Sequence, residues 1–215
     1  QGQRRWTNKA MIENKNIKFI RQKRCIGILG GTFDPAHKGH KRISNMALNI
    51  LKLDEIWWLV SLSNPLKKKD NISEFSLRFN NAKKFVKNRR IIVSDLEKKL
   101  NTPYTSEILN YLKREFPKTK FVWIMGIDNL DKFHFWLDWK KIFSKVPIAI
   151  FDRPFYSLNI LKSKCLGIFK KYRVSSLKSK VFKKTIPPSW IFLTGWSKPI
   201  SSTVIKENKL NNKND

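Results

Sequence analysis

The sequence has little cysteine, few acidic side chains and no long hydrophobic run, and each shortage excludes a class of protein. Its two cysteines, Cys25 and Cys165, form neither a metal-binding cluster nor a disulfide framework, so they fit a reducing compartment. No apolar run approaches the roughly 18 residues that a membrane-spanning helix requires. The first twenty residues lack the apolar stretch of a secretory signal. We therefore expect a cytoplasmic protein without membrane contact.

The scarcity of acidic residues leaves 16 of them against 45 basic ones, a net charge of +29 and a pI of about 10.3. One interpretation of this charge is a nucleic-acid-binding surface. The other is biased base composition, because Lys, Asn, Ile and Phe are abundant together. Lys far outnumbers Arg, although Arg makes the better bidentate contacts with phosphates and bases. We therefore expect no nucleic-acid partner, and assign part of the charge to attraction of an anionic substrate.

The chain divides into a polar, basic extension over 1–24, a single domain over 25–210 and a polar tail over 211–215. With 41% hydrophobic residues, 8 Trp and 15 Phe, the domain can bury a sizeable core. The basic stretch over 162–189 has no clear periodicity, and it forms either a loop or short helices. The role of this stretch and of the extension stays open.

Short apolar runs alternate with helical patterns along the domain. We expect strands over 25–30, 55–61, 90–94, 119–125, 146–151 and 190–194. Helical patterns cover 41–52, 75–87, 104–115, 156–170 and 202–209. The central strands are nearly continuous apolar runs, which is typical of parallel strands covered on both faces. The alternation predicts an α/β fold with a Rossmann-like, doubly wound parallel sheet, whose ligands bind beyond the carboxyl ends of the strands.

The most informative segment follows the first strand and reads Gly30-Gly31-Thr32-Phe33-Asp34-Pro35-Ala36-His37-Lys38-Gly39-His40. The glycines could simply close a tight turn, and a single histidine is more often structural than catalytic. Here, however, Thr32, His37 and His40 fall on one turn before a helix, where backbone N–H groups favour a phosphate. The segment therefore indicates attack on a nucleotide phosphate, assisted by hydrogen-bonding groups without a covalent intermediate. The two histidines alone do not make a metal site.

Three further polar segments follow later strands. Ser63 to Lys69 is either a solvated basic loop or the source of a lysine, most simply Lys67, for the outer phosphates. Gly126-Ile127-Asp128-Asn129 is either a turn with a helix cap or a site for ribose hydroxyls, with Trp136 or Trp139 as a stacking partner. Pro199 to Lys206 is either an ordinary helix cap or an anion site at a helix N-terminus.

These motifs together resemble the nucleotidyltransferases with a His-x-Gly-His signature, and within them the bacterial nicotinate mononucleotide adenylyltransferases. The first segment is similar to that family's Gly-Gly-Thr-Phe-Asp-Pro-x-His-x-Gly-His. Asn101 to Thr105 resembles its Thr-x-Tyr-Thr segment, and Met125 to Asp128 with Trp136 resembles its Gly-x-Asp and ring-stacking Trp. Ile200 to Lys206 resembles its Ile-Ser-Ser-Thr-x-Ile-Arg. The resemblance extends from about Cys25 to Lys209.

The resemblance implies a nucleotidyltransferase fold and transfer of the adenylyl group of ATP to nicotinate mononucleotide, a step of NAD biosynthesis, with Mg²⁺ entering as Mg-ATP. It implies catalytic roles for Thr32, His37, His40, Lys67 and Lys206. For ATP it implies Gly30, Gly31, Thr32, Phe33, His37, Gly39, His40, Gly126, Asp128, Ser201, Ser202 and Thr203. For the mononucleotide it implies Tyr104, Thr105, Trp136 and Arg153, with no metal ligand from the protein.

The sequence departs from the family pattern at two positions. Lys206 stands where the family usually has Arg, and it keeps the charge but loses the planar fork. The loop before Lys67 lacks the family's usual His, so either Lys67 or Lys68 could contact phosphate. The alternatives are a sibling enzyme that acts on nicotinamide mononucleotide or phosphopantetheine, and a basic nucleic-acid-binding protein that retains the fold. The sequence does not decide between a monomer and a homo-oligomer.

Overall fold

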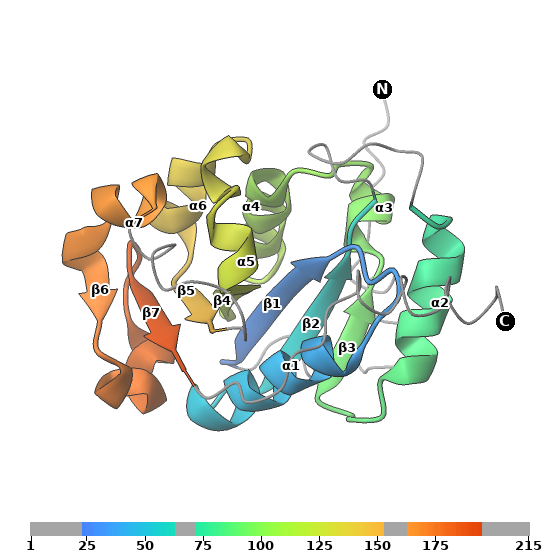
Figure 1. The fold of residues 1–215 in the computed structure, drawn as a ribbon, viewed down its shortest axis with the longest axis horizontal. Helices are drawn as coiled ribbons and strands as arrows, with labels where there is room; N and C mark the ends of the chain where they lie inside the picture. The colour runs from blue at the N-terminus through green and yellow to red at the C-terminus, as the bar shows by residue number, and fades with distance from the viewer. Residues whose placement is uncertain (1–22, 63–71, 153–162, 195–215) are drawn as a thin grey trace, which may run out of the picture.

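The computed structural model describes residues 23–62, 72–152 and 163–194. Within them, seven strands form one parallel sheet in the order β3-β2-β1-β4-β5-β7-β6 (Figure 1). The strands are β1 (Cys25–Gly31), β2 (Glu55–Val60), β3 (Ile91–Ser94), β4 (Lys120–Gly126), β5 (Ile148–Phe151), β6 (Arg173–Val174) and β7 (Trp190–Leu193). All six predicted strands are present. The two-residue strand β6 was not predicted, because it is too short to produce an alternating pattern.

The helices agree with the predicted ones less closely than the strands do. They are α1 (Lys38–Ile50), α2 (Phe75–Phe85), α3 (Leu96–Leu100), α4 (Thr105–Glu115), α5 (Ile127–Leu130), α6 (Trp139–Lys145) and α7 (Lys164–Ile168), with 3₁₀ turns η4 (Phe133–Phe135), η6 (Lys170–Tyr172) and η7 (Ser176–Lys184). Helix α1 begins three residues earlier than predicted. The predicted helix 156–170 is reduced to α7 in its described part, and 202–209 lies outside the described residues. The basic stretch over 162–189 contains short helices and β6.

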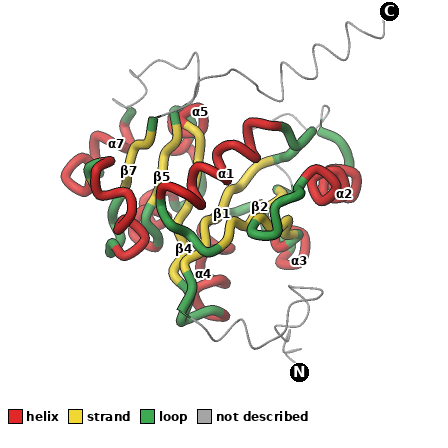
Figure 2. Tube along the Cα trace, turned by 90° about the horizontal axis from the view of Figure 1, so that it is seen from below, coloured by secondary structure: helices red, strands yellow, loops and turns green. Residues whose placement is uncertain are grey.

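Helices cover both faces of the sheet, and each face has its own apolar core. One core joins Ile43, Ala47 and Leu48 of α1 with Ala82 of α2 and Phe182 of η7. The other core packs helices α3 to α7 against the opposite strand face, through side chains such as Leu109 and Phe143. Figure 2 shows α1 and α4 on opposite sides of the strands. This is the Rossmann-like, doubly wound arrangement predicted from the alternating pattern. No helix in the described ranges is long and apolar enough to span a membrane.

The strand order places a topological switch point at β1, near the middle of the sheet. Strand β1 pairs with β2 on one side and with β4 on the other. The chain first adds β2 and β3 on one side of β1 and then reverses to add the remaining strands on the other side. Ligands of open parallel sheets bind where this reversal separates the loops at the carboxyl ends. The segments after Gly31 and Gly126 lie at this point, because Leu29 pairs with Ile124 near the ends of the two strands.

Gly27, in the middle of β1, provides a test of how closely the core packs against the sheet. A Cβ atom there would lie 2.5 Å from the Cδ1 atom of Ile124 and 2.6 Å from that of Ile56. We expect Gly27→Ala to lower the free energy of unfolding by roughly 1–3 kcal/mol, because the methyl group overfills the core. Urea denaturation measures the change. Gly167→Ala is the matched control, since a Cβ at that exposed helical position meets no atom within 4 Å. Equal stability of the two variants would contradict the packing.

Candidate active site

The turn after β1 is anchored by the side chain of Phe33. This residue has a φ of 50°, in the left-handed region that costs a side-chain-bearing residue roughly 1–2 kcal/mol. Its ring is fully buried and stacks on Trp58 of β2, with ring centroids 4.8 Å apart and an interplanar angle of 15°. Burial of a Phe side chain contributes about 1.5–3 kcal/mol, which offsets the backbone cost. The ring of this predicted ATP ligand therefore belongs to the core, and only its backbone is left for a ligand.

His37 and His40 form a reciprocal cap at the start of α1. The Nδ1 atom of His37 accepts the Gly39 N–H at 3.0 Å, and the Nδ1 atom of His40 accepts the His37 N–H at 3.2 Å. The two ring centroids are 3.9 Å apart. Because the helix begins at Lys38, the structure brings together the two histidines singled out in the sequence. Their capping also explains the early start of the helix, since these bonds satisfy N–H groups of its first turn.

The capping bonds determine what the two rings can offer a ligand. A neutral imidazole that accepts at Nδ1 carries its proton at Nε2, so the N–H of each ring lies on the nitrogen that does not cap the helix. Helix α1 has no acidic residue in its first turn, and its positive end is not offset from within the helix. Two imidazole donors at a helix N-terminus suit a phosphate oxygen.

The two glycines that end β1 differ in their packing. A Cβ atom on Gly30 would lie 2.8 Å from the Cη2 atom of Trp123, so this position needs glycine for close packing. On Gly31 a Cβ would make only an ordinary contact of 3.4 Å with the Phe33 ring. The Thr32 carbonyl beyond them accepts a hydrogen bond of 2.7 Å from Arg78. The turn is therefore constrained from both sides before it reaches the histidines.

The segment after β4 lies beside this turn. Gly126 is buried at the end of the strand and is the N-cap of α5, and Asp128 lies half-buried in the first turn of that helix. Trp136 is also half-buried, with its ring 5.0 Å from Phe133 and 6.0 Å from Trp123 between centroids. Trp136 therefore lies at the edge of the core, as expected for a stacking residue.

The other tryptophan of this segment packs against the same core. Trp139 contacts the rings of Phe133, Phe143 and Phe169, with centroid separations of 6.0 to 6.4 Å. Trp139 is half-buried like Trp136, so both tryptophans lie at the edge of the same core.

The segment around Tyr104 forms the start of α4. The Tyr104 N–H donates to the Oγ1 atom of Thr102 at 3.2 Å, and that hydroxyl donates to the Glu107 carboxylate at 2.5 Å. Among the described residues, the Tyr104 side chain makes no capping hydrogen bond to the helix. Tyr104 is 38% exposed, whereas Thr105 is buried. The N-terminus of an eleven-residue helix is thus presented at the carboxyl edge of the sheet, where it favours an anionic group.

Sequence reasoning missed the buried charged residues beneath the turn. Arg78 of α2 and Glu97 of α3 are 2% and 4% exposed, and Asp34 is nearly as buried. Glu97 accepts the Leu62 N–H at 2.8 Å, and Asp34 accepts the Ser73 N–H at 3.0 Å. Burial raises the pKa of Glu97 from its ordinary 4.5 to about 8 and lowers the pKa of Arg78. One signal could have found Arg78: a basic residue on the apolar face of an otherwise amphipathic helix.

Comparisons with known proteins agree with this geometry. Residues 28–208 match the sequence model of the cytidylyltransferase-like family. A protein of Bradyrhizobium sp. (strain ORS 278) is 40% identical over 84% of this chain and 94% of its own length. A protein of Agrobacterium fabrum is 37% identical over 85% of this chain and 98% of its own. Both carry the name "Probable nicotinate-nucleotide adenylyltransferase".

The chain belongs to the cytidylyltransferase-like family, among the nicotinate-nucleotide adenylyltransferases. The resemblance stated from the motifs is thereby confirmed. Among solved structures, nicotinic acid mononucleotide adenylyltransferase from Plasmodium falciparum in complex with NaAD has a TM-score of 0.65. That match covers 86% of this chain and 83% of the other at 20% identity, so it supports the fold alone. A second structure of the Plasmodium protein, in complex with APC, has a TM-score of 0.63.

Several residues that the adenylyltransferase pattern singled out lie outside the described part of the chain. They are Lys67, Lys68, Arg153, Ser201, Ser202, Thr203 and Lys206. The described part brings Thr32, His37 and His40 together on one turn, and the segment with Gly126 and Asp128 lies beside them. Tyr104 and Trp136 lie on separate elements that reach the same edge of the sheet.

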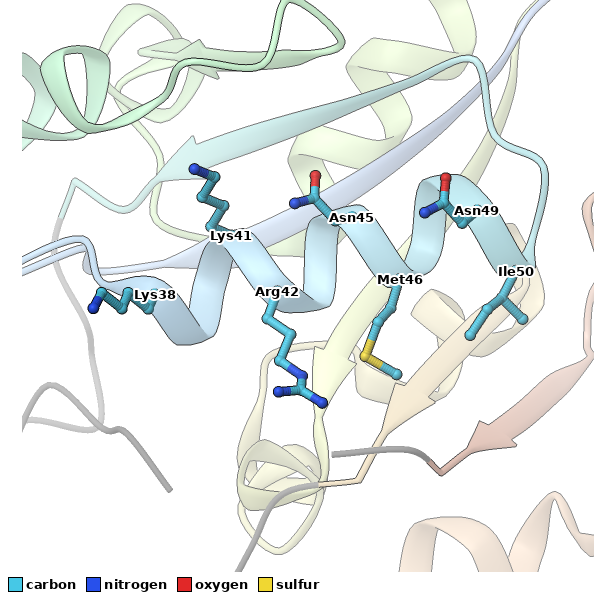
Figure 3. A pocket seen from close by; sticks show the side chains of 7 residues that line it. All are labelled: Lys38, Lys41, Arg42, Asn45, Met46, Asn49 and Ile50. Atoms are coloured by element: carbon cyan, nitrogen blue, oxygen red, sulfur yellow. The ribbon is translucent and has the colours of Figure 1, made fainter. Parts of the chain in front are cut away.

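An open hollow of about 440 Å³ runs along the outer face of α1. Its lining is Lys38, Lys41, Arg42, Asn45, Met46, Asn49 and Ile50. Figure 3 shows the three basic side chains at the start of the helix and Ile50 at its far end. None of the predicted site residues lines this hollow. Its basic end follows His37 directly, where it adds positive potential for an approaching anion.

The buried carboxyl of Glu97 predicts a pH effect on stability. Between about pH 4.5 and 8 the folded protein holds a proton that the unfolded chain has lost, so stability falls as the pH rises through this window. The full slope for one such group is roughly 1 kcal/mol per pH unit. We expect Glu97→Gln to remove this component, because the amide oxygen still accepts the Leu62 N–H without ionising.

Denaturant unfolding of wild type and Glu97→Gln at several values between pH 5 and 8 measures this difference. Glu74→Gln is the control, since Glu74 is exposed at the start of α2. If the wild type and Glu97→Gln lose stability in parallel across the window, Glu97 is ionised throughout and the expectation is wrong.

Proposed function

We propose that this chain transfers the adenylyl group of ATP to nicotinate mononucleotide, giving nicotinate adenine dinucleotide and pyrophosphate. The observation that carries the proposal is the reciprocal histidine cap, which places two imidazole rings side by side at a helix N-terminus directly after β1. The names of the relatives support the choice of substrates.

The proposed reaction is an in-line displacement at the α-phosphorus of ATP. A phosphate oxygen of the mononucleotide forms the new P–O bond, and the bond to the β-phosphate oxygen breaks and releases pyrophosphate. The attacking oxygen is already anionic, so the step needs no general base. His37, His40 and the backbone after Thr32 stabilise the charge that develops on the α-phosphate oxygens. The fixed turn contributes by holding the reacting groups in line.

The start of α4 is the proposed site for the nicotinate carboxylate. Thr105 and Ser106 occupy its first positions, where backbone N–H groups carry the positive end of the helix dipole. A carboxylate accepts hydrogen bonds from such groups, whereas the carboxamide of nicotinamide presents its own N–H donors to them. This difference favours nicotinate over nicotinamide. Tyr104 and Trp136 are proposed to contact the pyridine ring, and Gly126 and Asp128 the adenosine.

The remaining roles rest on residues outside the described part of the chain. We assign Lys67 and Lys206 to the leaving pyrophosphate, Ser201 to Thr203 to the triphosphate, and Arg153 to the mononucleotide phosphate. Mg²⁺ is proposed to arrive as Mg-ATP, where it neutralises phosphate charge. The described residues contain no group of three or more His, Cys, Asp or Glu side chains suited to a metal. Triphosphate oxygens and water are the ligands that Mg²⁺ brings with it in Mg-ATP.

Pyrophosphate release tests the proposal directly. The full chain is incubated with Mg-ATP and, separately, nicotinate mononucleotide, nicotinamide mononucleotide or phosphopantetheine. We expect pyrophosphate release to be clearly fastest with nicotinate mononucleotide. Preference for either of the others would keep the phosphate chemistry and overturn the role given to the start of α4. No release with any of them, together with tight and salt-dependent RNA or DNA binding, would favour a nucleic-acid-binding function.

Two substitutions of His37 separate its capping role from its donor role. In His37→Asn the side-chain oxygen can still accept the Gly39 N–H, but nothing replaces the Nε2 donor. In His37→Gln the amide can reach the Nε2 position, but the cap is lost. We expect His37→Asn to keep the wild-type unfolding free energy within about 1 kcal/mol and to lose roughly 10²–10³ in kcat. His37→Gln should be less stable and more active than His37→Asn. The opposite order of activities would refute the donor role.

A further inference from the structure

Arg78 makes an unusual set of contacts for a side chain buried in α2. Its Nε atom donates to the Ser73 carbonyl at 2.8 Å, and its Nη1 atom donates to the carbonyls of Thr32 at 2.7 Å and Ser61 at 3.0 Å. Nη2 lies 3.5 Å from the Leu62 carbonyl. One guanidinium thus joins the turn after β1, the end of β2 and the segment that precedes α2. A rigid fork of N–H groups can make these contacts together, and an ammonium cannot.

Two buried carboxyl groups accept hydrogen bonds from N–H groups of the same backbone segments. Asp34 accepts the Ser73 N–H and Glu97 accepts the Leu62 N–H, while the electrostatic interaction with Asp34 favours the charged form of Arg78. The N–H and C=O groups of Ser73 and Leu62 are therefore both engaged. These three side chains, Asp34, Arg78 and Glu97, are here called the buried triad.

Stability alone is a weak reason for such a triad. Burying a charged guanidinium carries a desolvation penalty, and well-packed apolar side chains often give equal or greater stability. The triad instead fixes the relative positions of the backbone segments that it joins. The Thr32 carbonyl is five residues from His37, at the entrance to a turn in which Phe33 holds a left-handed conformation. Displacement of about 1 Å at a reacting centre can cost 10²-fold in rate.

We propose that Arg78 is a positioning residue for adenylyl transfer. Its Nη1 atom donates to the carbonyls of both Thr32 and Ser61. These two bonds fix the turn that carries His37 and His40, here called the histidine turn, relative to the end of β2. Arg78 does not touch the substrates; it acts through the backbone that carries His37 and His40. The proposal concerns the same site as the proposed function and rests on it for the activity measurement.

The test uses Arg78→Lys, with Arg90→Lys as a matched control. Arg90 also donates to two backbone carbonyls of the β2 region, those of Leu53 and Asp54, but at the opposite edge of the sheet. We expect Arg78→Lys to lower kcat 10- to 100-fold while the KM for ATP and for nicotinate mononucleotide stays within about threefold. Arg90→Lys should keep the wild-type kcat. Guanidinium ion at millimolar, non-denaturing concentration should partly restore kcat in Arg78→Ala and should not affect Arg90→Ala.

A second readout does not depend on turnover. The imidazole signals of the protein's three histidines are followed by NMR, with His37 and His40 assigned through substitution of each. We expect Arg78→Lys to shift the signals of His37 and His40 and to leave His134 unchanged, while Arg90→Lys shifts none of the three. Circular dichroism and denaturant unfolding verify that each variant is folded under the conditions of assay.

The outcomes separate the two proposals. A folded Arg78→Lys with wild-type kcat and unshifted histidine signals overturns the positioning role. A fall in kcat that merely matches an increased unfolded fraction, with unshifted signals, assigns Arg78 to stability and also overturns it. If the wild type releases no pyrophosphate but Arg78→Lys still shifts His37 and His40, the proposed function fails while Arg78 remains the residue that sets the histidine turn.

Discussion

The stack of Phe33 on Trp58 is the contact on which the turn that carries His37 and His40 depends. It places a ring from the turn against a ring from β2, and the His40 ring lies 4.6 Å from Phe33 between centroids. The indole N–H of Trp58 donates to the hydroxyl of Ser44 in α1 at 2.7 Å. One tryptophan thus fixes both the turn and the helix that follows it. The apolar core and the histidine cap are parts of one structure, and a change in the first moves the second.

The parallel sheet explains why the polar groups gather at one edge. Each crossover returns the chain to the same end, so the segments that follow β1, β2 and β4 all emerge at the carboxyl edge. This convergence creates a difficulty, because strand ends carry backbone groups that the sheet does not pair. The buried triad pairs some of these backbone groups, those of Thr32, Ser61, Leu62 and Ser73. The polar interior beneath the site is therefore a consequence of the topology as well as of the chemistry.

The sequence was sufficient to predict the sheet because its central strands are nearly continuous apolar runs, as in β2, where the five residues after Glu55 are all apolar and buried. The start of α1 was predicted three residues late, because histidine is not among the side chains that usually cap helices. The motif assigned Phe33 to ATP, but no pattern indicates that a left-handed residue turns its ring into the core. The position of Arg78 on the apolar face of a helix could have marked it, but its partners could not be predicted, because they are backbone carbonyls from three separate segments. Helix α5, with four residues, is too short to produce a period.

The use of Arg and Lys within the structure bears on how the abundance of lysine should be interpreted. Within the described ranges, the cations that join two or more backbone carbonyls are arginines, Arg78 and Arg90. A lysine of these ranges that binds backbone contacts a single carbonyl, as in the 3.3 Å bond from Lys145 to Ser106. This division follows from geometry, since an ammonium is a point charge and a guanidinium is a fork. By the same argument, Lys206 in place of the family's usual Arg would offer pyrophosphate a charge without a fixed direction. Holding the leaving group in line would then fall more heavily on the histidine turn and on the backbone that Arg78 fixes.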